Sequence, residues 1–228
     1  MTKIVSIGSP PIEVHLKRSA RARRYSLRIS NVDSKVSLTL PERASERDAI
    51  GFAVRQEGWL RTALAKRPAL TLPALGQTVL YEGRDVRIMP GTGRSVTLQN
   101  DRIFVPGNAE TVAAKLRGYF KVQARQRLAA ASGRYAALIG RQLGTITLRD
   151  TRSRWGSCTA AGNLMYSWRL IMAPPEVLDY VAAHEVAHLL EMNHSPAFWA
   201  VVARLMPEYK THRAWLKRNG AMLHQVRL

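Results

Sequence analysis

The five residues His184-Glu185-Val186-Ala187-His188 constrain this chain more than any other part of its sequence. In a helix, two histidines four positions apart lie one above the other on one face, so both imidazoles face the same point. Two converging imidazoles supply half of a tetrahedral zinc site. Glu185 follows the first histidine and is placed to take a proton from a metal-bound water. The motif therefore predicts a zinc-dependent hydrolase built around one helix.

The residues that flank the motif favour this helix. Pro174-Pro175 suits a first helical turn, and Val177 and Val181 fall on the same stripe as the two histidines. The pair is therefore expected to emerge from a buried face. We expect the helix to end near residues 191–193, where Asn193 tolerates the left-handed conformation that stops helices and is the candidate for the turn.

A third metal ligand is expected shortly after the helix. His194 lies six residues beyond His188, and a chain that turns back there brings its imidazole to the same ion. Glu191 is the alternative ligand, but a side chain on the same helix has poor reach around the ion. Three protein ligands and one water make an open, catalytic site, and the sole cysteine, Cys158, argues against a cysteine-rich structural site.

Several blocks outside the motif resemble one known family. They are Arg154-Trp155-Gly156-Ser157-Cys158, Trp168-Arg169-Leu170, the H-E-x-x-H motif, His194-Ser195 and Phe198-Trp199. In this order and spacing they resemble the YgjP-like metallopeptidase family, over about residues 15–216 and most clearly after residue 149. The family commonly has leucine where this chain has Val186, which is a conservative apolar change.

The resemblance implies a zincin-like catalytic core that cleaves peptide bonds. It implies that His184, His188 and His194 bind a zinc ion (Zn2+) and that Glu185 is the catalytic acid/base. In zincins a strand beside the active helix offers its edge to an extended substrate, and residues 152–170 are placed to provide such an edge.

Arg154 is the candidate substrate-binding residue in that segment, because it can polarise a substrate oxygen or hold an anionic group. The alternative is a salt bridge to Glu176 or Asp179. We interpret Trp155 as a core residue and Cys158 as a small packed residue. A donor to the developing oxyanion is also needed. The sequence does not rank its four candidates, which are Arg154, Tyr166, Tyr209 and His212.

The chain is strongly basic, and this charge lies outside the motif region. Thirty-five Lys and Arg residues against sixteen Asp and Glu residues give a formal charge of +19, yet residues 151–200 hold three basic and four acidic side chains. The densest basic cluster consists of Lys17, Arg18, Arg21, Arg23, Arg24 and Arg28. Such a cluster attracts a nucleotide, nucleic acid or an acidic protein, or is a solvated surface. Only Tyr25 interleaves it, which weakly supports base stacking.

Composition also bounds the compartment. No apolar run approaches the roughly 20 residues of a membrane span, so no membrane partner is expected. Residues 1–8 lack the apolar segment of a secretory signal. A single cysteine forms no internal disulfide, which fits a reducing compartment, and we expect a cytoplasmic protein.

Periodicity predicts an α+β fold in a single domain at residues 15–222, with a linker or turn at 68–73. Strands are predicted at 12–16, 25–29, 36–40, 78–81, 85–89, 95–98, 102–105, 146–149 and 164–170. Helices are predicted at 45–65 with Ser45 as the cap, at 109–139 with an interruption or a kink near Gly133, at the metal motif, from Ser195-Pro196 through Leu205, and at 208–218. The lobe at 15–106 is β-rich, and the lobe at 107–222 is a mainly helical, zincin-like catalytic lobe with a short sheet.

The leading functional hypothesis is a zinc metallopeptidase with a peptide or protein substrate. One alternative is a metal-dependent hydrolase of nucleoside triphosphates, whose basic side chains bind phosphates without a G-x-x-x-x-G-K-[ST] loop. Another is a nucleic-acid-associated protease, and a third is an inactive, degenerate site.

Overall fold

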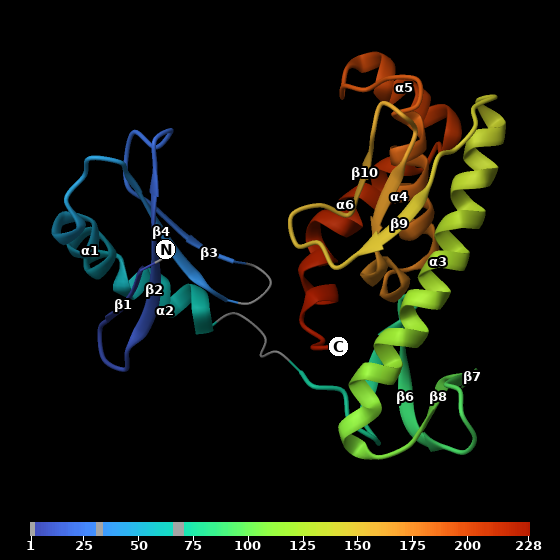
Figure 1. The fold of residues 1–228 in the computed structure, drawn as a ribbon, viewed down its shortest axis with the longest axis horizontal. Helices are drawn as coiled ribbons and strands as arrows, with labels where there is room; N and C mark the ends of the chain where they lie inside the picture. Colours follow the sequence, from blue (N-terminus) through green and yellow to red (C-terminus); the bar gives the residue numbers. More distant parts are fainter. Residues whose placement is uncertain (1–2, 31–33, 66–70) are drawn as a thin grey trace. The chain divides into compact units, whose positions relative to one another are not determined.

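The computed structural model describes residues 3–30, 34–65 and 71–228. Contacts divide the chain into two compact units, Met1–Leu70 and Thr71–Leu228, and each unit has its own hydrophobic core. Strands dominate the N-terminal part, and helices with a short sheet follow (Figure 1). The α+β prediction is therefore confirmed. Of the predicted linker at 68–73, residues 68–70 lie outside the described residues.

The first unit is a four-stranded sheet with two helices. Its elements are β1 (Lys3–Ile7), β2 (Ile12–Ser19), β3 (Ser26–Ile29), β4 (Val36–Pro41), α1 (Glu46–Arg55) and α2 (Glu57–Ala65). The strand order is β1-β2-β4-β3, in which β2 and β4 run parallel and the other neighbours antiparallel. Alternate residues such as Val14 and Leu38 are buried against Ala49 and Leu60 of the helices. Three of these strands were predicted, and β1 was missed.

The helical part of the first unit differs from its prediction in one respect. The Ser45 hydroxyl accepts a hydrogen bond from the Asp48 amide at 3.3 Å, which confirms the predicted cap. The single helix predicted at 45–65 is instead two helices. They are separated at Gln56, whose amide donates to the Ala53 carbonyl and closes α1.

The second unit begins with a second four-stranded sheet and a long helix. The elements are β5 (Thr78–Tyr81), β6 (Arg84–Gly91), β7 (Thr97–Gln99), β8 (Arg102–Pro106), the 3-10 helix η1 (Ala109–Thr111) and α3 (Val112–Leu138). The strand order is β5-β6-β8-β7. In Figure 1, α3 is one continuous helix, so the interruption predicted near Gly133 is wrong. An added Cβ at Gly133 meets no other atom, so this glycine marks neither a turn nor a close contact.

The rest of the second unit surrounds the motif helix. Its elements are β9 (Ile146–Arg149), β10 (Gly156–Cys158), β11 (Leu164–Ser167), η2 (Trp168–Met172), α4 (Pro175–Ala187), α5 (Pro196–Leu205), α6 (Tyr209–Asn219) and η3 (Gly220–His224). The short sheet has the order β10-β11-β9. The strand predicted at 164–170 ends at Ser167, because residues 168–172 turn into a buried 3-10 helix that packs against α3.

The division of the chain into two compact units falls between residues 70 and 71. The sequence analysis had placed the boundary between its two lobes at residues 106 and 107. The difference arises because the core of β5–β8 is continuous with α3 and α4. That residues 15–222 form a single domain stays a prediction. None of the helices in the described ranges is both long and apolar enough to span a bilayer.

Candidate metal centre and cleft

The predicted metal helix is α4. It starts with Pro175 at its first turn and carries His184 and Glu185 near its end, while His188 is its C-terminal cap. The α-helix ends at Ala187, about one turn before the predicted end at 191–193. Residues 188–190 continue as hydrogen-bonded turns, so His188 still lies one turn after His184.

Three imidazoles converge at the end of α4. His184, His188 and His194 each place a ring nitrogen so that these atoms lie within 4.8 Å of one another. The Nε2 atoms of His184 and His194 are 3.1 Å apart, and such a pair needs a hydrogen or a cation between them. Three imidazole nitrogen donors without a carboxylate match the ligand preference of zinc, so the residues present fit that ion.

The protonation of these histidines also suits a cation. Burial, followed by the neighbouring imidazoles of His188 and His194, lowers the pKa of His184 to about 3. Burial likewise lowers the pKa of His188. Both rings are therefore neutral at pH 7, which is the form that binds metals. The Nδ1 atom of His184 is buried and has no hydrogen-bond partner among the described residues.

The ring of His188 is oriented by the backbone. Its Nδ1 lies 2.9 Å from the carbonyl oxygen of Glu191, which can only accept, so Nδ1 carries the hydrogen and Nε2 keeps its lone pair. Such hydrogen bonds orient metal-binding histidines. Glu191 therefore contributes its carbonyl group, and its carboxylate is not part of the three-residue cluster.

One aromatic ring packs against all three imidazoles. The ring of Phe198 stacks on His188 at 4.4 Å and lies at 4.9 and 4.8 Å from the rings of His184 and His194. Phe198 is fully buried in α5, whose start is capped by the Ser195 hydroxyl. The sequence had suggested Phe198 only as a residue of the family pattern. Its position four residues after His194, in a capped helix, was the available signal.

The chain reverses between α4 and α5 by a side-chain hydrogen bond. The Asn193 side-chain oxygen accepts from the Ser195 amide at 3.1 Å, a local turn that asparagine favours. The expected left-handed backbone is not found at Asn193, because the non-glycine residues with positive φ in the described ranges are Ser34, Glu82 and Asn100. Asn193 thus lies in the predicted turn, in a different conformation.

Glu185 lies next to the imidazoles but outside their cluster. It is only 5% exposed, and burial raises its pKa to about 8, against the opposing charge of Arg154. Its carboxylate packs on the backbone of Gly156 in β10. A Cβ at that glycine would lie 2.5 Å from the Oε1 atom of Glu185 and 2.6 Å from its Cγ. Glycine in the Arg-Trp-Gly-Ser block therefore leaves the space that Glu185 occupies.

These side chains line an open cleft of about 540 Å³. One wall is the segment 153–158, which contains β10, and the opposite wall is α4 with the loop that carries Met192 and His194. Leu216 of α6 adds an apolar contact. The cleft thus contains polar groups for chemistry and apolar side chains for a ligand.

The structure also places the residues predicted between the motif blocks. Arg154 is exposed and lines the cleft, while its alternative partner Asp179 pairs with Arg134 at 2.6 Å. Trp155 was predicted to be a core residue. It packs on His224, and it also lines the cleft. Burial, followed by the charge of Glu185, raises the pKa of Cys158 to about 11, which keeps it an unreactive thiol.

The four candidate oxyanion donors differ in whether they line the cleft. Tyr166 is fully buried and shares a hydrogen bond of 3.0 Å with Ser132, away from the cleft lining. Tyr209 and His212 do not line the cleft either, which leaves Arg154. Tyr180, one turn before His184, does line it, and burial raises the pKa of its hydroxyl to about 12. The helical stripe of the motif was the signal for this missed residue.

A comparison with protein families matches most of the chain. A family model described as YgjP-like, metallopeptidase domain matches residues 23–219. No curated protein matches the chain. Among solved structures, the metallopeptidase zymogen of Pyrococcus abyssi abylysin is 21% identical with a TM-score of 0.36, over 40% of this chain and 93% of that chain. The family match includes all the cleft residues described above.

Proposed function

The chain belongs to the YgjP-like metallopeptidase domain family, and on this premise we propose that it is a zinc peptidase with Glu185 as its acid/base. The family makes it a metallohydrolase whose substrate is a peptide or protein. The observation that carries the proposal is the convergence of three imidazoles beside a buried carboxylate in an open cleft.

In this proposal His184, His188 and His194 hold the zinc ion. Three nitrogen ligands leave one position for water or substrate, as catalytic sites require. A bound zinc ion would polarise the scissile carbonyl and make the attacking water more acidic. The hydrogen bond from His188 to the Glu191 carbonyl and the packing of Phe198 keep the rings in place.

Glu185 moves the protons. As the base it accepts a proton from the attacking water, and as the acid it delivers that proton to the leaving nitrogen. Burial favours the protonated carboxyl, and the pKa is about 8 with the opposing charge of Arg154 included. The charge of Arg154 and a cation held by the imidazoles both favour the carboxylate, so the group is tuned toward neutral pH.

We propose that the substrate adds as a strand along β10. The pairing of β10 with β11 occupies one edge, and no strand of the described residues occupies the other edge, which borders the cleft. An extended peptide bound there would donate and accept backbone hydrogen bonds. Arg154 and the protonated Tyr180 hydroxyl then lie in the cleft as donors to the carbonyl oxygen.

Glu185→Gln tests the proposal. With zinc-loaded protein and a mixed peptide pool, we expect peptide cleavage that falls by roughly 10²–10⁴-fold in the variant, as for the loss of a general base. Glu176→Gln is the matched control, because Glu176 is an exposed carboxylate on the same helix.

A nucleoside triphosphate panel in the same assay tests the alternative substrate class. Among the described residues that line the cleft, Arg154 is the one lysine or arginine that could bind a phosphate group. Phosphate release that depends on Glu185, without peptide cleavage, would contradict the peptidase assignment of the substrate.

A further inference from the structure

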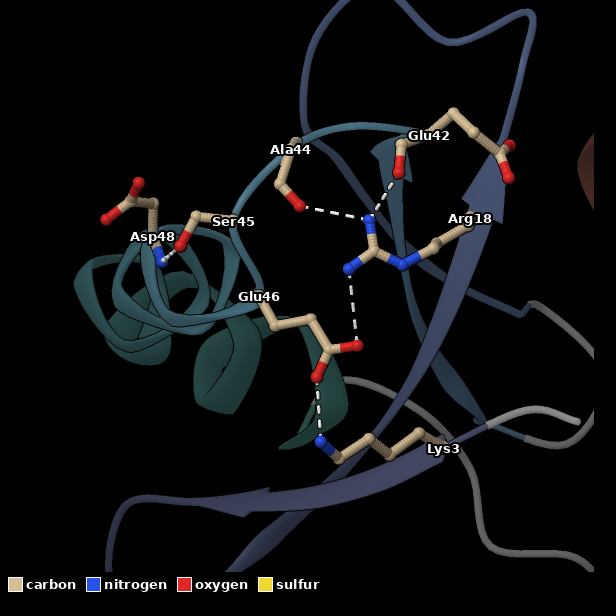
Figure 2. A network of polar contacts seen from close by, with 7 residues as sticks. All are labelled: Lys3, Arg18, Glu42, Ala44, Ser45, Glu46 and Asp48. Atoms are coloured by element: carbon tan, nitrogen blue, oxygen red, sulfur yellow. Dashed lines mark hydrogen bonds and ion pairs between the residues drawn. The ribbon is translucent and has the colours of Figure 1, made fainter.

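The residues of the densest basic cluster, all in the first unit, fall into two groups that differ in whether the side chain has a partner in the protein. Arg18 is engaged internally: its Nη1 donates to the carbonyls of Glu42 at 2.6 Å and Ala44 at 3.0 Å (Figure 2). Its Nη2 pairs with Glu46, which also binds Lys3 at 2.7 Å. Arg18 thus fixes the turn before α1, and its charge is compensated.

The other five members of the cluster form what we call the basic face: Lys17, Arg21, Arg23, Arg24 and Arg28. All five are exposed, and none makes an ion pair or side-chain hydrogen bond with any residue in the described ranges. The basic side chains of α3 behave differently, because most have partners in the protein. These pairs are Lys115 with the Pro106 carbonyl, Arg125 with the Ile146 carbonyl, Arg127 with Glu82, and Arg134 with Asp179.

Strand register brings the basic face together. The helices cover the side of the sheet that buries Val14, Leu16 and Leu38, so the alternate residues lie on the other side. On that side one cross-strand row is His15, Ser37 and Arg28, and the next is Lys17, Thr39 and Ser26. The segment 20–25 connects the end of β2 to the start of β3, next to the row that contains Lys17 and Ser26. Its three arginines therefore lie at that end of the sheet.

The spacing and the neighbours of these residues point to a phosphate backbone. Lys17 and Arg28 are separated by two strand spacings across the sheet and by two residues along the strands, so their backbones are about 12 Å apart. A few successive phosphates of a nucleic acid span this distance. Serine and threonine hydroxyls lie between them, and such mixtures of arginine and hydroxyl groups contact phosphates in nucleic-acid complexes. Among the described residues, the acidic neighbours in the chain are Glu13, at the opposite end of β2, and Glu42, which is next to Arg43.

Among the described residues of this face, the rings of Tyr25 and His15 are both half-buried. The ring centroid of Tyr25 lies 5.8 Å from that of Phe52. A partner would therefore be held by its charge and backbone, and not by its bases.

We propose that the basic face binds the phosphodiester backbone of nucleic acid without reading base sequence. The binding surface belongs to the first unit and uses none of the cleft residues. Contacts of this kind release counterions, so the affinity falls steeply with salt.

The experiment measures binding of the full chain to labelled 20-base-pair duplexes of two unrelated sequences, between about 50 and 200 mM salt. The test variant is Arg21→Gln/Arg23→Gln/Arg24→Gln. The matched control is Arg84→Gln/Arg87→Gln/Arg94→Gln, which removes the same charge from exposed positions of the second unit. A third variant, with lysine at positions 21, 23 and 24, keeps the charge.

We expect equal affinity for both sequences. We expect a loss of about tenfold or more in the test variant, together with a log–log salt slope shallower by about 2–3 for three lost phosphate contacts. The control and lysine variants should remain within about threefold of the parent. Circular dichroism and unchanged hydrolysis of a short neutral peptide verify the fold.

Three results would overturn the proposal. One is absence of duplex binding at the lowest salt. Another is an equal loss in the control triple variant, which would make binding a property of the net charge alone. The third is binding to polyglutamate as tight, and as dependent on the three arginines, as binding to the duplex, which would identify an acidic protein as the partner.

Discussion

The position of the catalytic carboxylate depends on one residue without a side chain. Gly156 of β10 lies directly against Glu185, and its backbone does not adopt a left-handed conformation, so the constraint is one of space. A methyl group there overlaps the carboxylate, whereas an alanine at Gly118 of α3 meets no atom.

We predict that Gly156→Ala lowers kcat/KM for peptide hydrolysis at least tenfold with an unchanged metal content, because Glu185 is displaced while the imidazoles are not. Gly118→Ala should retain activity and raise the free energy of unfolding by about 0.5–1 kcal/mol. Steady-state kinetics with metal analysis checks both. Full activity of Gly156→Ala would show that the observed position of Glu185 is unimportant.

A second residue gives the protein a pH-dependent stability. Burial, followed by the charge of Arg169, lowers the pKa of His224 to about 4. The unfolded chain binds a proton near pH 6.5, so the folded state loses stability as the pH falls from about 6.5 to about 4.

We predict that His224→Gln removes roughly 2 kcal/mol of this loss between pH 7 and pH 4. Denaturant unfolding of the metal-free protein across that range measures it. Parallel pH profiles of the two proteins would contradict the prediction. The ring of His224 also packs on Trp155, which lines the cleft, so His224 is in contact with a wall of the cleft.

At the scale of elements, one arginine joins three segments of the second unit. Arg169 in η2 forms a double hydrogen bond with Asp150 after β9, at 2.6 and 3.1 Å. It also donates to the carbonyls of Leu223 at 3.0 Å and Val226 at 2.9 Å. It therefore holds η3 and the C-terminal segment beside the short sheet.

We predict that Arg169→Lys costs about 2–4 kcal/mol of unfolding free energy, because lysine keeps the charge but lacks the fork that makes these bonds. Arg134→Lys, at an exposed pair with Asp179, should cost less than about 1 kcal/mol. Equilibrium unfolding compares them, and similar costs for both would show that the buried contacts of Arg169 contribute little.

Elements whose signal is local were predictable from the sequence. The motif helix α4 and the capped α5 follow from spacing and caps within one segment, and so does the approach of His194 to the histidine pair. Strand β10 was not among the predicted strands, since it has three residues, begins with glycine and is defined by pairing with residues 164–166. Likewise the buried run 168–172 suggests a strand, and only its packing against α3 shows a 3-10 helix.

The same distinction holds for the site. His184, Glu185 and His188 were predicted because their geometry follows from helical periodicity, and His194 was predicted from the turn expected after the helix. Tyr180, one helical turn before His184, was missed as a cleft residue, and the packing of Phe198 on the imidazoles was missed because it lies on the next helix. The roles of Gly156 and the Glu191 carbonyl depend on contacts that no sequence pattern encodes.

At the scale of the whole molecule, the basic face and the cleft occupy different parts of the chain. The cleft residues all belong to the second unit, while the basic face belongs to the first. On α3, most basic side chains have partners within the second unit. Of the described residues that line the cleft, Arg154 is the one lysine or arginine, so peptide hydrolysis and binding by the basic face can be tested by separate variants.

The metal content of the purified chain tests the central claim most directly. After exposure to equimolar zinc and gel filtration, we predict one zinc ion per chain by mass spectrometry, with less than a tenth of that in His194→Ala and full occupancy in Glu185→Gln. A chain that binds no zinc, or a His194→Ala variant that keeps it, would contradict the three-histidine site.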